Sequence, residues 1–201
     1  MNYTREQIKV TIESKNYKWF EGGDYNLNIV GIRNSNTLGK VTNKFDDLIT
    51  VSYSITGVKK FQSFGATTDP GAFYEQNLLN DDGVAILVPS QYRSTYKIDL
   101  HQGKYEALCQ RKPVKVYRDG NRDSVYDFNE DTIQEGYFGI NIHRATSITH
   151  GESTQVDKWS AGCQVIASND DYNLFMALVN KSSEIYGNSF TYTLIESKDI
   201  L

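Results

Sequence analysis

Two short segments of the chain contain residues that could carry out nucleophilic catalysis. The first, Tyr137 to Arg144, contains His143, and the second places Cys163 twenty residues later, directly after Ser160-Ala161-Gly162. At neutral pH a cysteine thiol is mostly protonated, so attack on a carbonyl carbon requires a neighbouring base or imidazolium that generates the thiolate. We therefore predict that Cys163 is a nucleophile and that His143 is its base.

The pattern around the histidine favours this interpretation. In an extended chain, Phe138, Ile140 and Ile142 lie on one side and His143 lies on the other, so the imidazole is expected to be presented opposite a buried face. The alternative is a structural pair, with the cysteine as a small buried apolar residue and the histidine as a satisfied surface group. The glycine beside the cysteine and the polar presentation of the histidine favour catalysis.

Backbone amides near the cysteine are expected to stabilise the negatively charged oxygen that forms when a thiolate adds to a carbonyl. The small residues before Cys163 allow a tight turn, so the amides of Ala161, Gly162 and Cys163 are the predicted donors. Since histidine precedes cysteine along the chain, the order differs from that of papain-like peptidases, in which cysteine comes first.

The two segments, Ile142-His143-Arg144 and Ser160-Ala161-Gly162-Cys163-Gln164-Val165, resemble the catalytic signature of the L,D-transpeptidases of the YkuD type. These β-rich enzymes take an acyl group from a peptidoglycan tetrapeptide, release D-alanine and pass the acyl group to an amine, or in some relatives to water. The resemblance implies that Cys163 is the nucleophile, that His143 is the base, that the Arg144 carbonyl orients the imidazole and that the Gly162 and Cys163 amides bind the oxyanion.

The resemblance covers roughly residues 100 to 170, and its specific part is confined to the two segments. Ala161 replaces a usual histidine and Gln164 replaces a usual arginine. The two segments are also similar to a phage and prophage branch of this fold with cell-wall-degrading or unassigned roles. Four residues are predicted to contact the substrate, and these are Tyr137, Trp159, Ser160 and Gln164.

A non-enzymatic alternative remains open, in which the fold is retained as a binding or structural part of a virion or secretion apparatus. A third alternative is a zinc peptidase that uses His143 and His150, although the compact spacing of a zinc motif is absent. His101, at the end of a predicted strand, is expected to pack or cap locally, and it is the third candidate histidine after His143 and His150. Cys109 is interpreted as structural, and both cysteines are predicted to be free thiols.

An acidic segment places oxygen ligands at positions one, three, five, nine and twelve of a calcium loop, and these are Asp119, Asn121, Asp123, Asp127 and Glu130. Position six, normally glycine, is Ser124, and the flanks predict strands in place of paired helices. The segment is therefore either a structural calcium site or a solvated turn. The predicted chemistry requires no cofactor.

Length and charge limit the classes of function. The 201 residues fit one domain, divided loosely near residue 60 into an N-terminal part, 1–60, and a catalytic part, 61–201, or undivided. The net charge of −4, without a continuous basic face, argues against nucleic-acid binding. Neither a signal peptide nor a membrane-spanning stretch is recognisable. We expect a protein made in the cytoplasm that reaches the cell wall by lysis, specialised export or virion delivery; its oligomeric state stays open.

The predicted elements form a mainly β, α+β fold, which the resemblance specifies as an L,D-transpeptidase-like β-sandwich. A short helix is expected near residues 4 to 14, where Thr4 and Gln7 form a capping box. Ala72 to Leu79 is expected to form helical turns, and a later helix is capped by Ser168 or Asn169, ends at Gly187 and carries Leu174, Leu178 and Ile185 on one face. Strands are predicted at Leu27–Ile32, Leu48–Ile55, Val84–Val88, Tyr96–Leu100, Val114–Tyr117, Tyr137–Ile142, Gln164–Ala167 and Phe190–Ile195.

Overall fold

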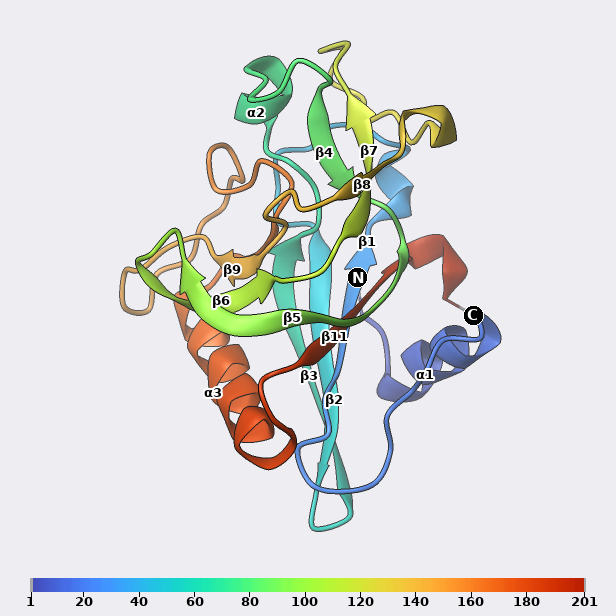
Figure 1. Ribbon diagram of the computed structural model, residues 1–201, viewed down its shortest axis with the longest axis vertical. Coiled ribbons are helices and arrows are strands. Elements are labelled where there is room, and N and C mark those ends of the chain that lie inside the picture. The colour runs from blue at the N-terminus through green and yellow to red at the C-terminus, as the bar shows by residue number, and fades with distance from the viewer. Residues whose placement is uncertain (1, 201) are drawn as a thin grey trace.

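The computed structural model describes residues 2–200, and its largest element is a closed barrel of eight strands (Figure 1). In order around the barrel these are β1 (Asn28–Arg33), β11 (Phe190–Glu196), β5 (Ser90–His101), β6 (Tyr105–Gln110), β9 (Ile142–Arg144), β10 (Gln164–Ile166), β3 (Val58–Thr67) and β2 (Asp47–Ile55). The β1–β11 and β9–β10 pairs are parallel, and the other neighbours are antiparallel. The predicted mainly β class is confirmed.

The main sheet closes on itself, whereas the sequence was expected to form two facing sheets. Closure arises because β1 pairs with β2 on one side and with β11 on the other. The alternation of apolar and polar residues is the same in a sandwich and in a barrel, so the sequence pattern does not distinguish them. A separate three-stranded sheet consists of β4 (Val84–Leu87), β7 (Val114–Asp119) and β8 (Gln134–Gly136).

The loosely predicted domain boundary near residue 60 falls inside β3. The β2–β3 hairpin pairs residues 47–55 with residues 58–66, so strands from both sides of this boundary belong to one barrel.

The first helix, α1 (Arg5–Ser14), begins as its sequence predicts. The Thr4 hydroxyl accepts a hydrogen bond from the Gln7 backbone, and the Gln7 side chain accepts one from the Thr4 backbone, which confirms the capping box. The helix buries Ile8 and Ile12 against the outer face of β1. Because α1 covers this face while the barrel interior covers the other, all six residues of β1 are buried.

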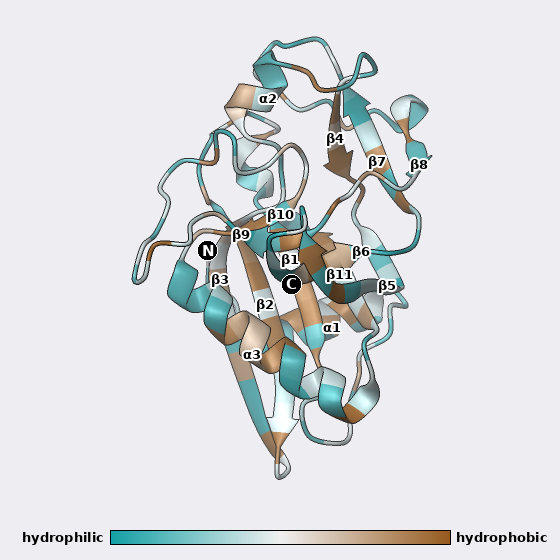
Figure 2. Cartoon of the chain, turned by 60° about the vertical axis from the view of Figure 1, so that its left-hand side comes forward, coloured by the Kyte–Doolittle hydropathy of each residue, from teal (hydrophilic) through white to brown (hydrophobic). Residues whose placement is uncertain are grey.

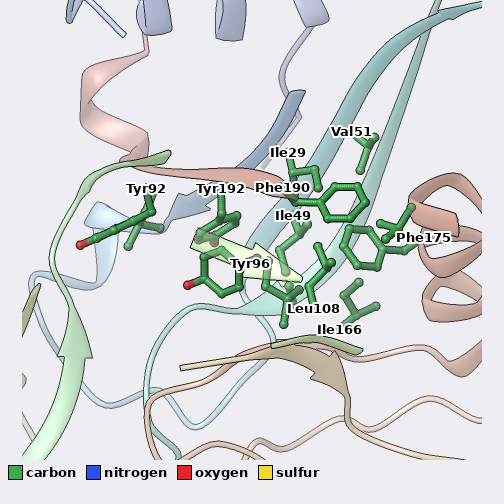
Figure 3. Close-up of a cluster of buried hydrophobic side chains, with 14 of the residues drawn as sticks. Ile29, Ile49, Val51, Tyr92, Tyr96, Leu108, Ile166, Phe175, Phe190 and Tyr192 are labelled. Carbon is green, nitrogen blue, oxygen red and sulfur yellow. The ribbon is translucent and has the colours of Figure 1, made fainter. Parts of the chain in front are cut away.

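Aromatic side chains fill the interior of the barrel. Tyr96 and Tyr192 lie side by side in the core with ring centroids 5.8 Å apart (Figure 3). Both are fully buried, and burial of large side chains is the main stabilising contribution to such a core. Gly31 makes room for this pair, since a Cβ atom at this position would lie 1.8 Å from the Tyr192 hydroxyl.

The late helix, α3 (Asn169–Tyr186), is capped by Ser168 and followed by Gly187 at φ 86°, as predicted. Its buried face was predicted incorrectly in part: Leu178 is buried, but Leu174 and Ile185 are 41% and 48% exposed. Tyr172, Phe175, Met176 and Val179 supply the rest of the buried face, because the helix packs on the barrel along a stripe rotated from the aliphatic residues. Figure 2 shows hydrophilic and hydrophobic bands alternating along α3.

The remaining elements are short. The turns predicted after residue 72 form α2 (Ala72–Gln76), and three 3₁₀ helices occupy Ser35–Thr37, Glu130–Thr132 and Ser197–Asp199. The other strand predictions correspond to observed strands, except Tyr137–Ile142. Within residues 2–200, no helix combines the length and apolar composition needed to cross a membrane.

The predicted strand Tyr137–Ile142 is wrong over most of its length, because only Ile142 belongs to a strand. Gly139 adopts a φ of 72°, which interrupts an extended chain. The Gln110 side-chain oxygen accepts hydrogen bonds from the backbone of Phe138 and Ile140, at 3.2 Å and 3.0 Å. These bonds replace those of a regular strand ladder, although Ile140 and Ile142 remain buried as the alternation predicts.

Candidate active site

The strands β9 and β10 bring the two predicted catalytic segments together. They pair in parallel, with His143 opposite Val165, so Cys163 lies just before the strand that neighbours the one carrying the histidine. Both His143 and Cys163 line a cavity of about 650 Å³. The gap of twenty residues is thus closed by the fold.

His143 is buried, with 4% of its surface exposed, although the sequence pattern suggested a more open position. Its Nδ1 atom lies 2.9 Å from the Arg144 carbonyl oxygen. A carbonyl oxygen only accepts hydrogen bonds, so Nδ1 carries the proton and Nε2 keeps a lone pair. This hydrogen bond has the partners that the resemblance implies, and it prepares Nε2 to accept a proton.

The electrostatic surroundings keep the His143 ring neutral. Burial, followed by the neighbouring His101, lowers the pKa of His143 to about 3, while the hydrogen bond to Arg144 opposes the shift. A buried imidazolium loses the hydration that stabilises its charge. At neutral pH, His143 is therefore a neutral base and does not act as a resident cation.

Cys163 is partly exposed at the cavity, but its sulfur is surrounded by protein. The thiol donates a hydrogen bond to the Gly139 carbonyl oxygen at 3.3 Å. Burial raises the pKa of the thiol to about 11, although a backbone hydrogen bond from Asn141 lowers it. In the described chain no hydrogen bond joins this thiol to the His143 ring, so the resting site is a neutral thiol beside a neutral imidazole.

Two further side chains surround the base: Tyr105, which was not predicted, and His101, which was only the third candidate histidine. His101, the last residue of β5, stacks on His143 with ring centroids 4.2 Å apart and an angle of 23°. The Tyr105 hydroxyl lies 3.4 Å from His143 Nδ1 and 3.5 Å from the Arg144 carbonyl oxygen. Their strands are far from residue 143 in sequence, and only the barrel pairing places them here.

The turn before Cys163 is held by Ser160. The Ser160 hydroxyl donates to the Cys163 carbonyl oxygen at 2.8 Å and accepts from the Gly162 amide at 3.1 Å. The Gly162 amide is therefore occupied, which contradicts its predicted role as an oxyanion donor. No hydrogen bond within residues 2–200 engages the amides of Ala161 and Cys163, and these two remain the candidate donors.

Two predicted substrate contacts, Ser160 and Gln164, are corrected by the structure, because both are 0% exposed. The Gln164 amide nitrogen donates to the Thr68 and Gly162 carbonyl oxygens, each at 3.3 Å, and its oxygen accepts from the Tyr192 hydroxyl at 2.7 Å. Gln164 thus connects the cysteine turn to the barrel core. Its side chain supports the Cys163 segment from the barrel interior and does not line the cavity.

The other two predicted contacts lie at cavity walls. Trp159 is 45% exposed and lines the cavity that contains Cys163, whereas Tyr137 is 70% exposed and lines a second cavity of about 300 Å³. The two cavities share Tyr74, Leu79 and Ala161, so they adjoin one another beside the cysteine turn. Together they offer an extended binding surface.

The charged residues of these two cavities are all basic. Lys104, Arg144 and Lys158 line the first cavity, and Arg118 lines the second; no carboxylate occurs among the lining residues. This contrasts with the net charge of −4 for the whole chain. A local excess of positive charge attracts anionic ligands.

The acidic segment forms a turn closed by its own hydrogen bonds. The Asn121 amide nitrogen donates to Asp123 and Asp127 at 3.2 Å and 2.9 Å, while Asp119 is buried and accepts from the Asp127 backbone. A calcium ion requires oxygen ligands where this amide nitrogen lies, so the arrangement does not fit the predicted site, and Glu130 is exposed in the following 3₁₀ helix. Residues 2–200 contain no group of three or more His, Cys, Asp or Glu side chains placed to hold a metal.

The zinc alternative receives no support from the position of His150. This side chain is 82% exposed, pairs with Asp170 at 2.6 Å and does not line the cavity of His143. Both cysteines are free thiols, as predicted. Cys109 is buried and its thiol donates to the Asp99 carbonyl oxygen at 3.5 Å, in keeping with its structural interpretation.

No protein-family model, curated protein or solved structure matches this chain. The assignment of chemistry therefore depends on the geometry of the site and on the two short segments.

Proposed function

We propose that this protein is a cysteine-dependent acyl-transfer enzyme that acts on peptidoglycan stem peptides through a Cys163 thioester, with His143 as the base. The observation that carries the proposal is the shared cavity: Cys163 and His143 both line it, and the hydrogen bond of Nδ1 to Arg144 leaves His143 Nε2 free to accept a proton. The motif resemblance supports an L,D-transpeptidase-like fold and activity.

The proposed reaction begins when a bound substrate carbonyl approaches Cys163. The thiol leaves its hydrogen bond to Gly139 and passes its proton to His143 Nε2, while the sulfur forms a bond to the carbonyl carbon. The amides of Ala161 and Cys163 donate to the oxyanion. When the carbon–nitrogen bond breaks, the imidazolium returns its proton to the departing amine, and a thioester remains.

The second half of the reaction restores the enzyme. An amine or a water molecule attacks the thioester carbon and loses a proton to neutral His143, and the sulfur leaves and regains that proton as a thiol. An amine acceptor gives transpeptidation and water gives hydrolysis. Both outcomes use the same groups of the protein.

The charges of the cavities support an anionic acyl donor. Peptidoglycan stem peptides carry carboxylates, and the basic side chains Lys104, Arg144 and Lys158 could pair with them. The two adjoining cavities could hold segments on both sides of the scissile bond.

Intact-mass spectrometry tests the proposed thioester. After incubation with a carbapenem or with a tetrapeptide stem, wild-type protein should gain the mass of one acyl group, located at Cys163 by peptide mapping. Cys163→Ala should abolish the adduct and His143→Ala should slow its formation at least 100-fold, whereas Cys109→Ala should react normally. Absence of any adduct and of any turnover of peptidoglycan fragments would refute the proposal.

The thiol geometry favours one alternative, a non-enzymatic binding protein of a virion or secretion apparatus. The sulfur points to Gly139 and the thiol is neutral, as in a structural cysteine. This alternative expects Cys163→Ala to retain biological function. It also expects Trp159→Ala, at the exposed cavity wall, to abolish binding.

A further inference from the structure

His101 and His143 form a stacked pair on the wall of the cavity. The rings lie 4.2 Å apart at an angle of 23°, and they come from different strands, β5 and β9. Both side chains line the cavity that contains Cys163. Two imidazoles this close interact electrostatically, so a proton on one ring disfavours a proton on the other.

A chain of hydrogen bonds fixes the orientation of His101. The Asn141 side-chain oxygen accepts from the Gln110 backbone at 2.8 Å, so the Asn141 amide nitrogen is the atom that faces His101 Nδ1 at 3.1 Å. Since this nitrogen donates, Nδ1 of neutral His101 is the acceptor and Nε2 carries the proton. His143 has the opposite tautomer, with its proton on Nδ1.

The Nε2 atoms of both rings remain accessible. No hydrogen bond within residues 2–200 engages either atom, and neither is among the unpartnered polar atoms sealed from solvent. The two rings therefore present opposite functions to the cavity. His143 presents a lone pair and His101 presents an N–H group.

The groups around the pair offer no carboxylate to stabilise a second positive charge. Lys104 precedes β6 and lowers the pKa of His101 after the larger effect of burial, and Arg144 lies over the Tyr105 ring at 4.3 Å. The remaining titratable groups that line the cavity are Tyr74, Tyr105, Lys158 and Cys163, none of which is a carboxylate. A pair with these neighbours can hold one proton more readily than two.

We propose that His101 is a positioning residue that holds the His143 ring in its working orientation and, through the stacked contact, opposes a second positive charge beside it. The catalytic meaning of this role rests on the proposed function. As the pH falls, a proton on His101 opposes a second one on His143, so the base stays available. When Cys163 transfers its proton to His143, the stacked His101 is neutral and accommodates the single charge.

His101→Phe tests the proposal because it keeps a flat ring but removes the ionisable nitrogens. In NMR titrations with labelled histidine, the pKa of His143 should rise by at least about half a pH unit in this variant. The acid limb of the pH profile for acylation of Cys163 should move up by the same amount. His101→Gln, which also removes the stacking ring, should likewise raise the pKa of His143. It should lower the rate of Cys163 acylation more than His101→Phe does.

His150→Phe is the matched control, since His150 is exposed and pairs with Asp170. It should leave the titration of His143 and the acid limb unchanged. If the titration of His143 and the acid limb also stay unchanged in folded His101→Phe protein, the proposed role of His101 is refuted. The NMR titration needs no substrate, so a shift of His143 in a protein that forms no acyl-enzyme would count against the proposed function alone.

Discussion

At Cys163 and His143, burial has opposite effects on the two pKa values. It raises the pKa of the thiol to about 11 and lowers that of the imidazole to about 3, so the uncharged form of each side chain is the stable one. In the proposed reaction, proton transfer between them must therefore be driven by the bound substrate. A thiol in this state is protected from general oxidation and alkylation when no substrate is present.

The rate of Cys163 alkylation by iodoacetamide should show this protonation state. Because thiolate is the reactive form, the rate should rise about tenfold per pH unit from neutral pH up to about pH 10. The rate, measured by mass spectrometry in Cys109→Ala protein, should be equally steep in His143→Ala at alkaline pH. A plateau beginning near neutral pH would instead show a preformed thiolate–imidazolium pair.

At the residue scale, the sequence predicted only those features that depend on near neighbours. The Arg144 carbonyl adjoins His143, and their hydrogen bond requires no long-range contact. The position of His101 depends on the pairing of β6 with both β5 and β9, which no local pattern specifies. The predicted Gly162 donor was wrong because the Ser160 hydroxyl, two residues earlier, accepts from that amide.

At the scale of elements, the turn before Cys163 packs closely against the three-stranded sheet. Gly162 has a φ of 130°, and a Cβ atom there would lie 2.2 Å from the Ala85 carbonyl oxygen in β4. Only glycine therefore allows the turn to lie so close to this strand. The three-stranded sheet thereby helps to define the position of Cys163.

Gly162→Ala should disturb both stability and the site. The close contact with Ala85 and the unfavourable φ should lower the free energy of unfolding by about 2–4 kcal/mol, and the rate of Cys163 acylation should fall with it. Urea unfolding and acylation kinetics measure the two effects. Gly57→Ala is the control, because its φ of 78° is also unfavourable but nothing lies within 4 Å, so a loss of only about 1 kcal/mol is expected.

The ends of the helices were predicted more accurately from the sequence than their buried faces. Thr4 and Gln7 define the start of α1, and Ser168 and Gly187 define the limits of α3, because caps depend on residues a few positions apart. The segment from Tyr137 was misassigned because the Gln110 side chain, distant in sequence, satisfies its backbone. Propensity alone does not reveal such a partner.

At the scale of the whole molecule, charge is distributed unevenly. The chain is acidic, yet the cavity near Cys163 is lined by basic side chains and by no carboxylate. The charge of the cavity lining thus differs in sign from the net charge of the chain. Anionic ligands would be attracted locally while the rest of the surface repels them.

Lys104→Gln and Lys158→Gln should weaken binding of an anionic acyl donor. Each substitution should raise KM about three- to tenfold with a small effect on kcat, since it removes a positive charge remote from the reacting atoms. Added salt should raise KM in wild-type protein and have less effect in the double variant. Lys97→Gln, on β5 but outside the cavity lining, should behave as wild type; equal loss in all three would contradict local recognition.

A buried carboxyl in the barrel wall should make stability depend on pH. Asp47 accepts hydrogen bonds from the Asn34 backbone and from the Thr68 backbone and hydroxyl. Burial, followed by the nearby Asp69, raises its pKa from 3.8 to about 7. Because the folded protein holds this proton more tightly, the stability contributed by the group is complete below pH 3.8 and is lost as the pH rises to about 7.

Asp47→Asn should flatten this pH dependence. In wild-type protein, the free energy of unfolding should fall between about pH 4 and pH 7 by up to about 1.4 kcal/mol per pH unit from this group. Urea unfolding across that range measures the slope, with the adjacent Asp46→Asn as control. A slope that Asp47→Asn leaves unchanged would assign the effect to other groups.

Closure of the barrel was the whole-molecule feature that the sequence could not specify. Apolar alternation predicted most strands, but a sandwich and a barrel use the same alternation on each strand. The decisive contacts are the pairing of β1 with β11, about 160 residues later, and with β2. Contacts between residues so far apart in sequence depend on packing throughout the core.

The parallel strands β9 and β10 hold the two candidate catalytic residues at either end of a connecting segment. The strands fix His143 and the end of the Cys163 turn, while the backbone between them leaves the barrel and includes an exposed stretch at residues 147–150. Residues inserted in this exposed stretch need not change the distance between the paired strands β9 and β10. Diversification of ligand preference could therefore proceed there by insertion, with the chemistry kept intact.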